Sequence, residues 1–256
     1  MILFTKLHGN GNDFVLIDEY EGEVIPEKSA FAKRFCDRRF GIGADGVLFI
    51  SRSKHANLRM RIFNPDGSEA EMCGNGVFCV AKYSVEAGHI VLGVIKMETL
   101  AGDLRAEVRR ELGEVWAKVD MPVSEPFSEK ELAGFKVFAL NVGVPHAIIF
   151  VDDLKIPVAE IAPKIRFDPI FPRGANVNFV LVEHGGLRIR TYERGVEVET
   201  LSCGTGAVAS AFIANRLGKV GDDVSVQTKG GLLRVYISDH VFLEGTAEIV
   251  YEGVIR

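Results

Sequence analysis

The sequence LRMRIF at Leu58–Phe63 returns later in the chain as LRIRTY at Leu187–Tyr192. The motif CGNG at Cys73–Gly76 follows the first copy, and CGTG at Cys203–Gly206 follows the second. The two motifs recur in the same order at offsets of 129 and 130 residues (58 to 187 and 73 to 203). We interpret the chain as two halves of one design that was duplicated and then diverged.

The pattern of apolar residues predicts the same order of elements in each half. In the first half, we expect strands at 1–7, 13–18, 46–51, 57–63, 93–99 and 103–110, with helices at 28–39 and from the Cys73 turn to about residue 86. In the second half, we expect strands at 136–141, 146–151, 176–183, 187–193, 223–228, 231–237 and 241–244, with helices at 157–165 and from the Cys203 turn to about Leu217. Gly88 and Gly218 are the expected helix stops.

Both helices that follow the cysteine motifs lack a polar face, reading GVFCVA at 76–81 and AVASAFIA at 207–214. A helix that is apolar all round is buried on every side. We therefore predict an α/β (α+β) fold of two pseudo-symmetric domains, each a β-barrel-like sheet wrapped around a central buried helix, with the active site in the cleft between them. The expected domains are residues 1–115, joined by 247–256, and residues 116–246, with a linker near 112–126.

The composition excludes several classes of protein. The chain has 256 residues, 47% of them hydrophobic and 25% charged, which is typical of a globular protein and not of a disordered one. No apolar run has the length of a membrane span, and the early charges argue against a secretory signal. A net charge of −5 gives no basic face for nucleic acid. Four cysteines without a secretory signal indicate reduced thiols in the cytoplasm.

The two repeated cysteines are placed where a thiol can do chemistry. Cys73 and Cys203 each stand between a predicted strand and a predicted buried helix, so we expect them at helix N-termini, where negative charge is favoured. This environment favours the thiolate, and the adjacent glycines let a carboxylate or phosphate approach the backbone N–H groups. A pseudo-two-fold axis would make the two thiols face each other. Cys36 and Cys79 are instead expected to be small buried apolar residues.

A facing pair of thiols is compatible with three functions. The pair could form a disulfide or redox couple, bind a metal, or move a proton from one face of a carbon to the other. The chain has no C-x-x-C spacing and no histidine pair at metal-ligand spacing, which disfavours zinc. Proton transfer needs one thiolate base and one thiol acid on opposite sides of the carbon, which is racemisation or epimerisation. The repeat supplies that arrangement directly.

The motifs together resemble those of the diaminopimelate epimerases over nearly the whole chain. The resemblance rests on His8–Phe14 (HGNGNDF), Gly41–Gly46 (GIGADG), Phe63–Ser68 (FNPDGS), Cys73–Gly76 (CGNG), Val144–His146 (VPH), Ala175–Phe179 (ANVNF), Tyr192–Gly195 (YERG) and Cys203–Gly206 (CGTG). Members of this family interconvert LL- and meso-diaminopimelate in lysine biosynthesis without pyridoxal phosphate or metal. The resemblance therefore implies an isomerase that needs no cofactor.

The resemblance also implies roles for individual residues. Cys73 and Cys203 would be the acid and base pair, and His146 and Glu193 would help to generate the thiolate and to hold the α-ammonium group. The α-carboxylate would lie on the N–H groups of the residues that follow each cysteine, which are Gly74, Asn75, Gly204 and Thr205. The distal end of the substrate would be held by Asn12, Asn64, Asn176 and Arg194. Two departures from the family pattern bear on the choice of substrate: Val144 stands where members often carry Asn, and the loop at 195–202 is longer.

Two other functions stay open at this stage. One is a two-thiol racemase that acts on another amino acid, and the other is a dithiol redox protein whose Cys73–Cys203 disulfide is functional. We expect a small-molecule substrate, which the resemblance identifies as LL- or meso-diaminopimelate, and neither nucleic acid nor a membrane as a partner. The sequence leaves formation of a homodimer open.

Overall fold

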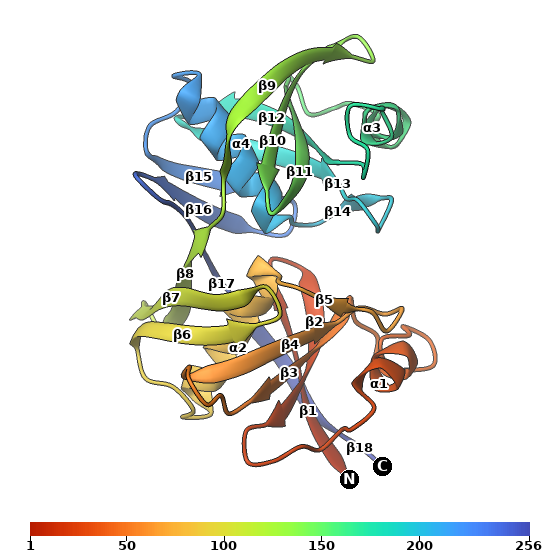
Figure 1. The fold of residues 1–256 in the computed structure, drawn as a ribbon, viewed down its shortest axis with the longest axis vertical. Helices are drawn as coiled ribbons and strands as arrows, with labels where there is room; N and C mark the ends of the chain where they lie inside the picture. The colour runs from red at the N-terminus through yellow and green to blue at the C-terminus, as the bar shows by residue number, and fades with distance from the viewer. The chain divides into compact units, whose positions relative to one another are not determined.

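The computed structural model describes all of residues 1–256, which form two compact units (Figure 1). Unit 1 comprises Met1–Val119 and Gly245–Arg256, and unit 2 comprises Asp120–Glu244. The chain therefore leaves unit 1 once and returns to it at its C-terminal end. None of the helices is long and apolar enough to cross a membrane.

Unit 1 contains two helices, α1 and α2, and most of its residues are in strands. Its elements are β1 (Ile2–Gly9), β2 (Asn12–Glu19), α1 (Lys28–Phe35), β3 (Gly46–Ser51), β4 (Leu58–Phe63), β5 (Glu69–Ala70), α2 (Gly74–Glu86), β6 (Gly93–Thr99), β7 (Gly102–Glu111), β8 (Glu114–Met121, which crosses the boundary at Val119) and β18 (Glu248–Ile255). The strands pair in the order β18–β1–β2–β3–β4–β6–β7–β8, with β5 on β4. Only β2–β3 and β4–β6 are parallel.

Unit 2 has the same plan. Its elements are β9 (Ser124–Leu132), β10 (Phe135–Val142), β11 (Val144–Phe150), α3 (Val158–Arg166), β12 (Asn176–Glu183), β13 (Gly186–Tyr192), β14 (Glu199–Thr200), α4 (Gly204–Arg216), β15 (Asp223–Gln227), β16 (Leu232–Ile237) and β17 (Val241–Thr246, which crosses the boundary at Glu244). The pairing order is β9–β10–β11–β12–β13–β15–β16–β17, and only β11–β12 and β13–β15 are parallel. The parallel pairs fall at the same two places as in unit 1, which confirms the duplication.

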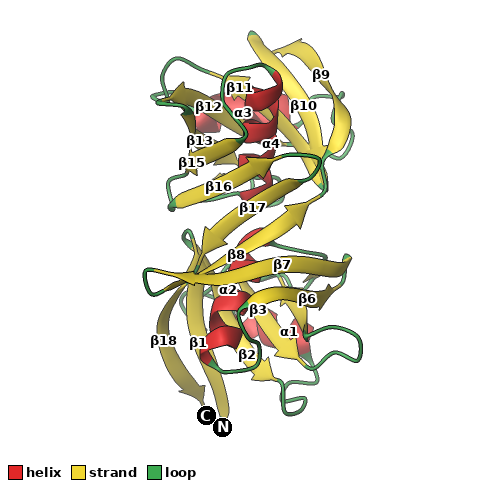
Figure 2. Ribbon diagram, turned by 90° about the vertical axis from the view of Figure 1, so that its left-hand side faces the viewer, coloured by secondary structure: helices red, strands yellow, loops and turns green.

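The helix that follows each cysteine is the centre of its own unit. In α4, ten of the thirteen residues are buried, and the helix contacts β10, β11, β12, β13, β15 and β16. In α2, nine of the thirteen residues are buried. Figure 2 shows each helix enclosed by the strands of its unit. The predicted fold class is confirmed, and Gly88 (φ +76°) and Gly218 (φ +67°) follow the two helices in the left-handed conformation expected of stops.

Two local predictions differ from the structure. The helix expected at 28–39 ends at Phe35, because the side chain of Asp37 accepts the N–H groups of Arg39 and Phe40 and turns the chain. The expected linker at 112–126 is occupied by β8 and the start of β9, because alternate residues of β8 are buried. Residues 248–255 form β18, which pairs with β1.

Candidate active site

Cys73 and Cys203 occupy the same position in the two units. Each is the residue before a helix, with extended backbone angles (φ −146°, ψ 121° for Cys73 and φ −135°, ψ 107° for Cys203). The first helical hydrogen bonds run from Val77 N–H to the Cys73 carbonyl (3.0 Å) and from Ala207 N–H to the Cys203 carbonyl (2.9 Å). The three N–H groups between each pair have no acceptor within the helix and carry its partial positive charge. Each thiol therefore lies beside an anion-binding helix end, as the sequence predicts.

The side chains next to Cys73 are amides. The Cys73 thiol donates to Asn12 Oδ1 at 3.6 Å, and Asn75 Nδ2 lies 3.4 Å from the same oxygen. Asn75 is buried, and its Oδ1 has no hydrogen-bond partner. A buried polar atom without a partner is costly unless something else satisfies it. The Cys73 turn therefore joins Asn12 and Asn75, two of the residues predicted to bind substrate.

A charged cluster anchors Asn12 from behind. Asn12 Nδ2 donates to Asp45 Oδ2 at 3.0 Å, and Arg38 pairs with both Asp45 (2.8 Å) and Asp13 (2.7 Å). Burial alone would raise the pKa of Asp13, but hydrogen bonds from Arg38 and Lys6 outweigh it and hold the pKa at about 2. Asp13 is thus ionised at neutral pH, and the cluster keeps the start of β2 in place.

In unit 2, the Cys203 turn carries a hydroxyl, and the neighbouring loop carries charge. Cys203 Sγ lies 3.5 Å from Thr205 Oγ1. Glu193 and Arg194 open the loop after β13, and both side chains are partly buried. Asn176, the first residue of β12, accepts the Arg194 N–H through Oδ1 at 2.7 Å. The structure therefore joins Asn176 to the Glu193–Arg194 loop.

His146 lies at the centre of a buried polar network. The ring is fully buried, and Asn178 Nδ2 lies 3.1 Å from Nδ1 while Asn176 Nδ2 lies 3.5 Å from Nε2. Burial lowers the pKa of His146 to about 3, and the charge of Arg194 acts in the same direction. The imidazole is therefore neutral at physiological pH, and one ring nitrogen accepts while the other donates.

The loop that carries Glu193 and Arg194 is held by a partly buried ion pair. Arg166, at the end of α3, donates to Glu197 at 2.7 Å, and its side chain is only 9% exposed. Glu197 adopts a left-handed backbone (φ +59°) and also accepts the Gly195 N–H at 2.9 Å. The loop at 195–202, which is longer than in the family pattern, is thus an ordered turn closed by Glu197.

Asn64 and Glu193 occupy equivalent places, each directly after the strand that precedes a cysteine turn. The backbone N–H of Asn64 donates to Ser68 O (2.8 Å), and that of Glu193 donates to Val198 O (3.0 Å). The Asn64 side chain donates to Ser68 Oγ at 3.0 Å, so it also stabilises its own turn. Both residues lie at the ends of β4 and β13 that lead into the turns.

Sequence reasoning missed three residues of unit 2, namely Asn178, Thr191 and Arg166. Asn178 and Thr191 are fully or almost fully buried, and the neighbours of Asn178 in β12 are the apolar Val177 and Phe179. An amide in an apolar strand is a signal that could have identified them, because buried polar groups are nearly always hydrogen-bonded. The role of Arg166 had no such signal, because its partner is 31 residues away in sequence.

The other two cysteines are unsuited to catalysis. Burial raises the pKa of the Cys36 thiol to about 11, and Cys36 packs in an apolar cluster with Phe31 and Ala44. Cys79 lies inside α2, where burial, with Cys73 and Asp13 nearby, raises its thiol pKa well above the usual value. A reactive cysteine needs the opposite environment. Both therefore act as buried apolar residues, as predicted.

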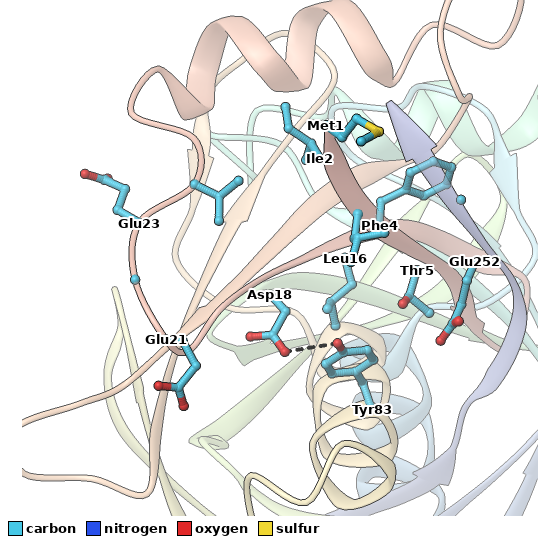
Figure 3. A pocket seen from close by; sticks show the side chains of 14 residues that line it. Met1, Ile2, Phe4, Thr5, Leu16, Asp18, Glu21, Glu23, Tyr83 and Glu252 are labelled. Atoms are coloured by element: carbon cyan, nitrogen blue, oxygen red, sulfur yellow. Dashed lines mark hydrogen bonds between the residues drawn. The ribbon is translucent and has the colours of Figure 1, made fainter. Parts of the chain in front are cut away.

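Unit 1 also contains a cavity that includes none of the predicted site residues. It has a volume of about 620 Å³ and is lined by parts of β1, β2, β18 and the loop at 21–24, together with Tyr83 of α2 (Figure 3). Asp18 accepts a hydrogen bond from Tyr83 Oη at 3.0 Å and pairs with His89 at 2.6 Å. The carboxylates that line the cavity are exposed or paired. The cavity lies at the end of β2 opposite to Asn12.

Comparison with known proteins identifies relatives along the whole chain. The family model described as diaminopimelate epimerase matches residues 4–124 and 138–250. A diaminopimelate epimerase from Methanocella arvoryzae is 55% identical over 99% of this chain and 96% of its own length. One from Archaeoglobus fulgidus is 49% identical over 100% of this chain and 96% of its own length.

Solved structures with the same fold are far more distant in sequence. A phenazine biosynthesis protein of the PhzF family from Bacillus anthracis superposes with a TM-score of 0.76 at 19% identity, covering 100% of this chain and 99% of its own. A probable proline racemase from Agrobacterium radiobacter superposes with a TM-score of 0.73 at 18% identity, covering 100% of this chain and 93% of its own. These likenesses establish the two-domain fold.

Proposed function

The chain belongs to the diaminopimelate epimerase family, and on that premise we propose that it is an isomerase that interconverts LL- and meso-diaminopimelate by proton transfer between Cys73 and Cys203. The observation that carries the proposal is the equivalence of the two cysteines, each of which precedes a buried helix at the same place in a duplicated fold. Nothing in a simple anion-binding site would require a thiol at both helix ends, because the N–H groups suffice.

In the proposed reaction, one thiolate removes the α-proton and the other thiol delivers a proton to the opposite face of the same carbon. The roles of Cys73 and Cys203 exchange when the reaction runs in reverse. The α-carboxylate is held by the N–H groups of Gly74, Asn75, Gly204 and Thr205, which also stabilise the charge that develops in the carbanionic transition state. This charge stabilisation takes the place of an organic electron sink, so no cofactor is required.

The remaining predicted residues position the substrate. We propose that Glu193 holds the α-ammonium group, and that Asn12, Asn64, Asn176 and Arg194 hold the distal amino-acid group. Arg194 suits the distal carboxylate because its guanidinium can donate two parallel hydrogen bonds. The hydrogen bond from the Arg194 N–H to Asn176 supports this assignment, because it fixes two of these residues relative to each other.

The test follows hydrogen exchange at the α-carbon. Reduced protein is incubated with LL-diaminopimelate in D2O without added cofactor, and deuterium at the α-carbon is measured together with the meso product. We expect both signals in the wild type, their loss in Cys73→Ala and in Cys203→Ala, and their retention in Cys36→Ala, which removes a buried thiol. Absence of exchange in the folded, reduced wild type would refute the assignment.

The same assay separates the other two functions. A racemase of broader specificity would act equally well on 2-aminopimelate, which lacks the distal ammonium group. A redox protein would show no exchange with any amino acid and a reversible Cys73–Cys203 disulfide. In our proposal that disulfide is an inactivating product.

We further propose that the protein works in the cytoplasm as a homodimer. The proposed chemistry needs reduced thiols, which the cytoplasm maintains. The β1–β18 pair exposes large apolar side chains, among them Leu3 (75% exposed) and Val254 (48%), which are directly opposite each other. Sedimentation should give about twice the 28.1 kDa mass of the chain, and Leu3→Glu should reduce it to the monomer value.

A further inference from the structure

The two units differ directly beneath their cysteine turns. Strand pairing places Leu48 opposite Ile62 in unit 1 and Asn178 opposite Thr191 in unit 2, at equivalent positions. A Cβ on Gly76 would lie 3.3 Å from the Leu48 side chain, and one on Gly206 would lie 2.4 Å from Asn178 Oδ1. The residue that lies under the turn is therefore apolar in unit 1 and an amide in unit 2.

The orientation of the Asn178 amide is fixed by two neighbours. Thr191 Oγ1 donates to Asn178 Oδ1 at 2.9 Å, and Asn178 Nδ2 donates to the carbonyl of Ala147 at 3.2 Å. A reversed amide would direct its oxygen at the Ala147 carbonyl, with two acceptors facing each other. The Nδ2 group therefore also faces His146 Nδ1, at 3.1 Å.

We infer that Asn178 is a positioning residue that holds His146 in the neutral tautomer with the proton on Nε2. An N–H donor at 3.1 Å requires Nδ1 to be the acceptor, so the single ring proton lies on Nε2. The opposite tautomer would place two donors against each other at that distance. His146 is then a hydrogen-bond donor in the site and not the base that removes a proton from a thiol.

The donor end of His146 points toward the residues proposed to bind substrate. Nε2 lies 3.5 Å from Asn176 Nδ2, and the orientation of Asn176 is set because its oxygen accepts the Arg194 N–H. Two N–H donors this close can share one acceptor, such as a carboxylate oxygen or a thiolate. The identity of this acceptor rests on the proposed function, whereas the tautomer of His146 does not.

The tautomer is tested by NMR of protein labelled with 15N-histidine, read at pH 7 through the long-range couplings between ring nitrogens and carbon-bound ring protons. Nε2 couples strongly to both ring protons, so the coupling pattern tells the two nitrogens apart, and the 15N shift of each shows whether it is protonated. The pattern that is lost in His146→Gln belongs to His146. We expect the protonated nitrogen of His146 to be Nε2. If the wild-type ring carries its proton on Nδ1, or carries protons on both nitrogens, the inference is overturned without the need for a variant.

Variants connect the tautomer to activity. Asn178→Asp places an acceptor at Nδ1 without changing the size of the side chain, so we expect the proton to move to Nδ1 and kcat/KM to fall about a hundredfold, as for the loss of one preorganised donor. Ser210→Ala is the matched control, because it removes a buried hydroxyl of α4 that has no hydrogen-bond partner, so the Nε2 proton and wild-type activity should remain.

The outcomes separate this inference from the proposed function. An unchanged tautomer and full activity in Asn178→Asp would overturn the role of Asn178. If the wild type shows the Nε2 proton but does not act on diaminopimelate, the proposed function fails while the assignment of the ring stands.

Discussion

His146 shows how burial changes the protonation of one residue. The ring has no contact with solvent, and its pKa of about 3 lies below the value of about 6.5 that it has in the unfolded chain. The folded state therefore binds fewer protons than the unfolded state between these two values. The contribution of the ring to stability is complete above pH 6.5 and is lost progressively as the pH falls toward 3.

This difference in proton binding predicts how the unfolding free energy depends on pH. Between pH 7.5 and 4.5, the wild type should lose about 2 to 3 kcal/mol more of its unfolding free energy than His146→Gln does, because protonation of the ring is possible only in the unfolded state. Urea unfolding at the two pH values measures the difference. Asp13 does not interfere, because its carboxylate titrates near pH 2 in the folded state and below pH 4 in the unfolded state. Equal losses in both proteins would show that the ring is solvated.

The reactive residues could be identified from sequence because duplication marks them twice. A single CGxG motif is weak evidence, whereas Cys73 and Cys203 at equivalent places in two halves are strong evidence. Asn178 could not be identified in this way, because the equivalent residue in unit 1 is Leu48. The function of Asn178 depends on the direction of its amide, which Thr191 and Ala147 fix and which no sequence pattern contains.

Among the elements, the central helices were the easiest to predict. Both α2 and α4 are apolar on all sides, so their burial follows from composition alone. The end of α1 was harder, because the side chain of Asp37 turns the chain in a stretch that is otherwise compatible with helix. The strand β8 was missed because glycine and proline at its two ends resemble a linker.

The loop that carries Glu193 and Arg194 gives a prediction at the scale of an element. Gly174 has φ +68°, and a Cβ there would lie 1.2 Å from the Arg166 guanidinium, whereas Gly185 has φ +76° and open space around it. Gly174→Ala should therefore release Arg166 from Glu197. We expect it to lower the unfolding free energy by about 1 to 3 kcal/mol more than Gly185→Ala, which adds backbone strain alone.

Gly174→Ala and Gly185→Ala should also differ in substrate binding. The KM of Gly174→Ala should rise, because the loop is no longer held at Glu197, while that of Gly185→Ala should stay at the wild-type value. Equal stabilities and equal KM values in the two variants would show that the Arg166–Glu197 pair does not organise the loop. Thermal or urea unfolding and steady-state kinetics provide the comparison.

The duplication accounts for the division of the chain into two units. It does not account for the strand that unit 1 takes from the C-terminal end of the chain. In unit 1, the place of β9 of unit 2 is taken by β18, which comes from the other end of the chain. The sequence joins residues 247–256 to the first half, but it does not indicate which strand they pair with, because β18 has no equivalent at the same offset in the repeat. Its exposed residues alternate weakly, so the pattern alone does not indicate which strand it pairs with.

The pairing of β18 with β1 can be tested by shortening the chain. Removal of residues 248–256 would leave β1 without its partner along Ile2–His8. We expect the amides of β1 that β18 protects to exchange rapidly with D2O, while those of α4 in unit 2 stay protected. Removal of Arg256 alone should change neither. Continued protection of β1 in the shorter chain would contradict the observed pairing.

The central claim is that two thiols, and not one base, move the proton. It is tested most directly by the deuterium content of product and substrate at low conversion of LL-diaminopimelate in D2O. With two thiols, the first meso product carries solvent deuterium at the α-carbon while the remaining substrate carries none, because the proton is removed and delivered by different groups. Product that retains the substrate's own hydrogen in the first turnovers would contradict the account.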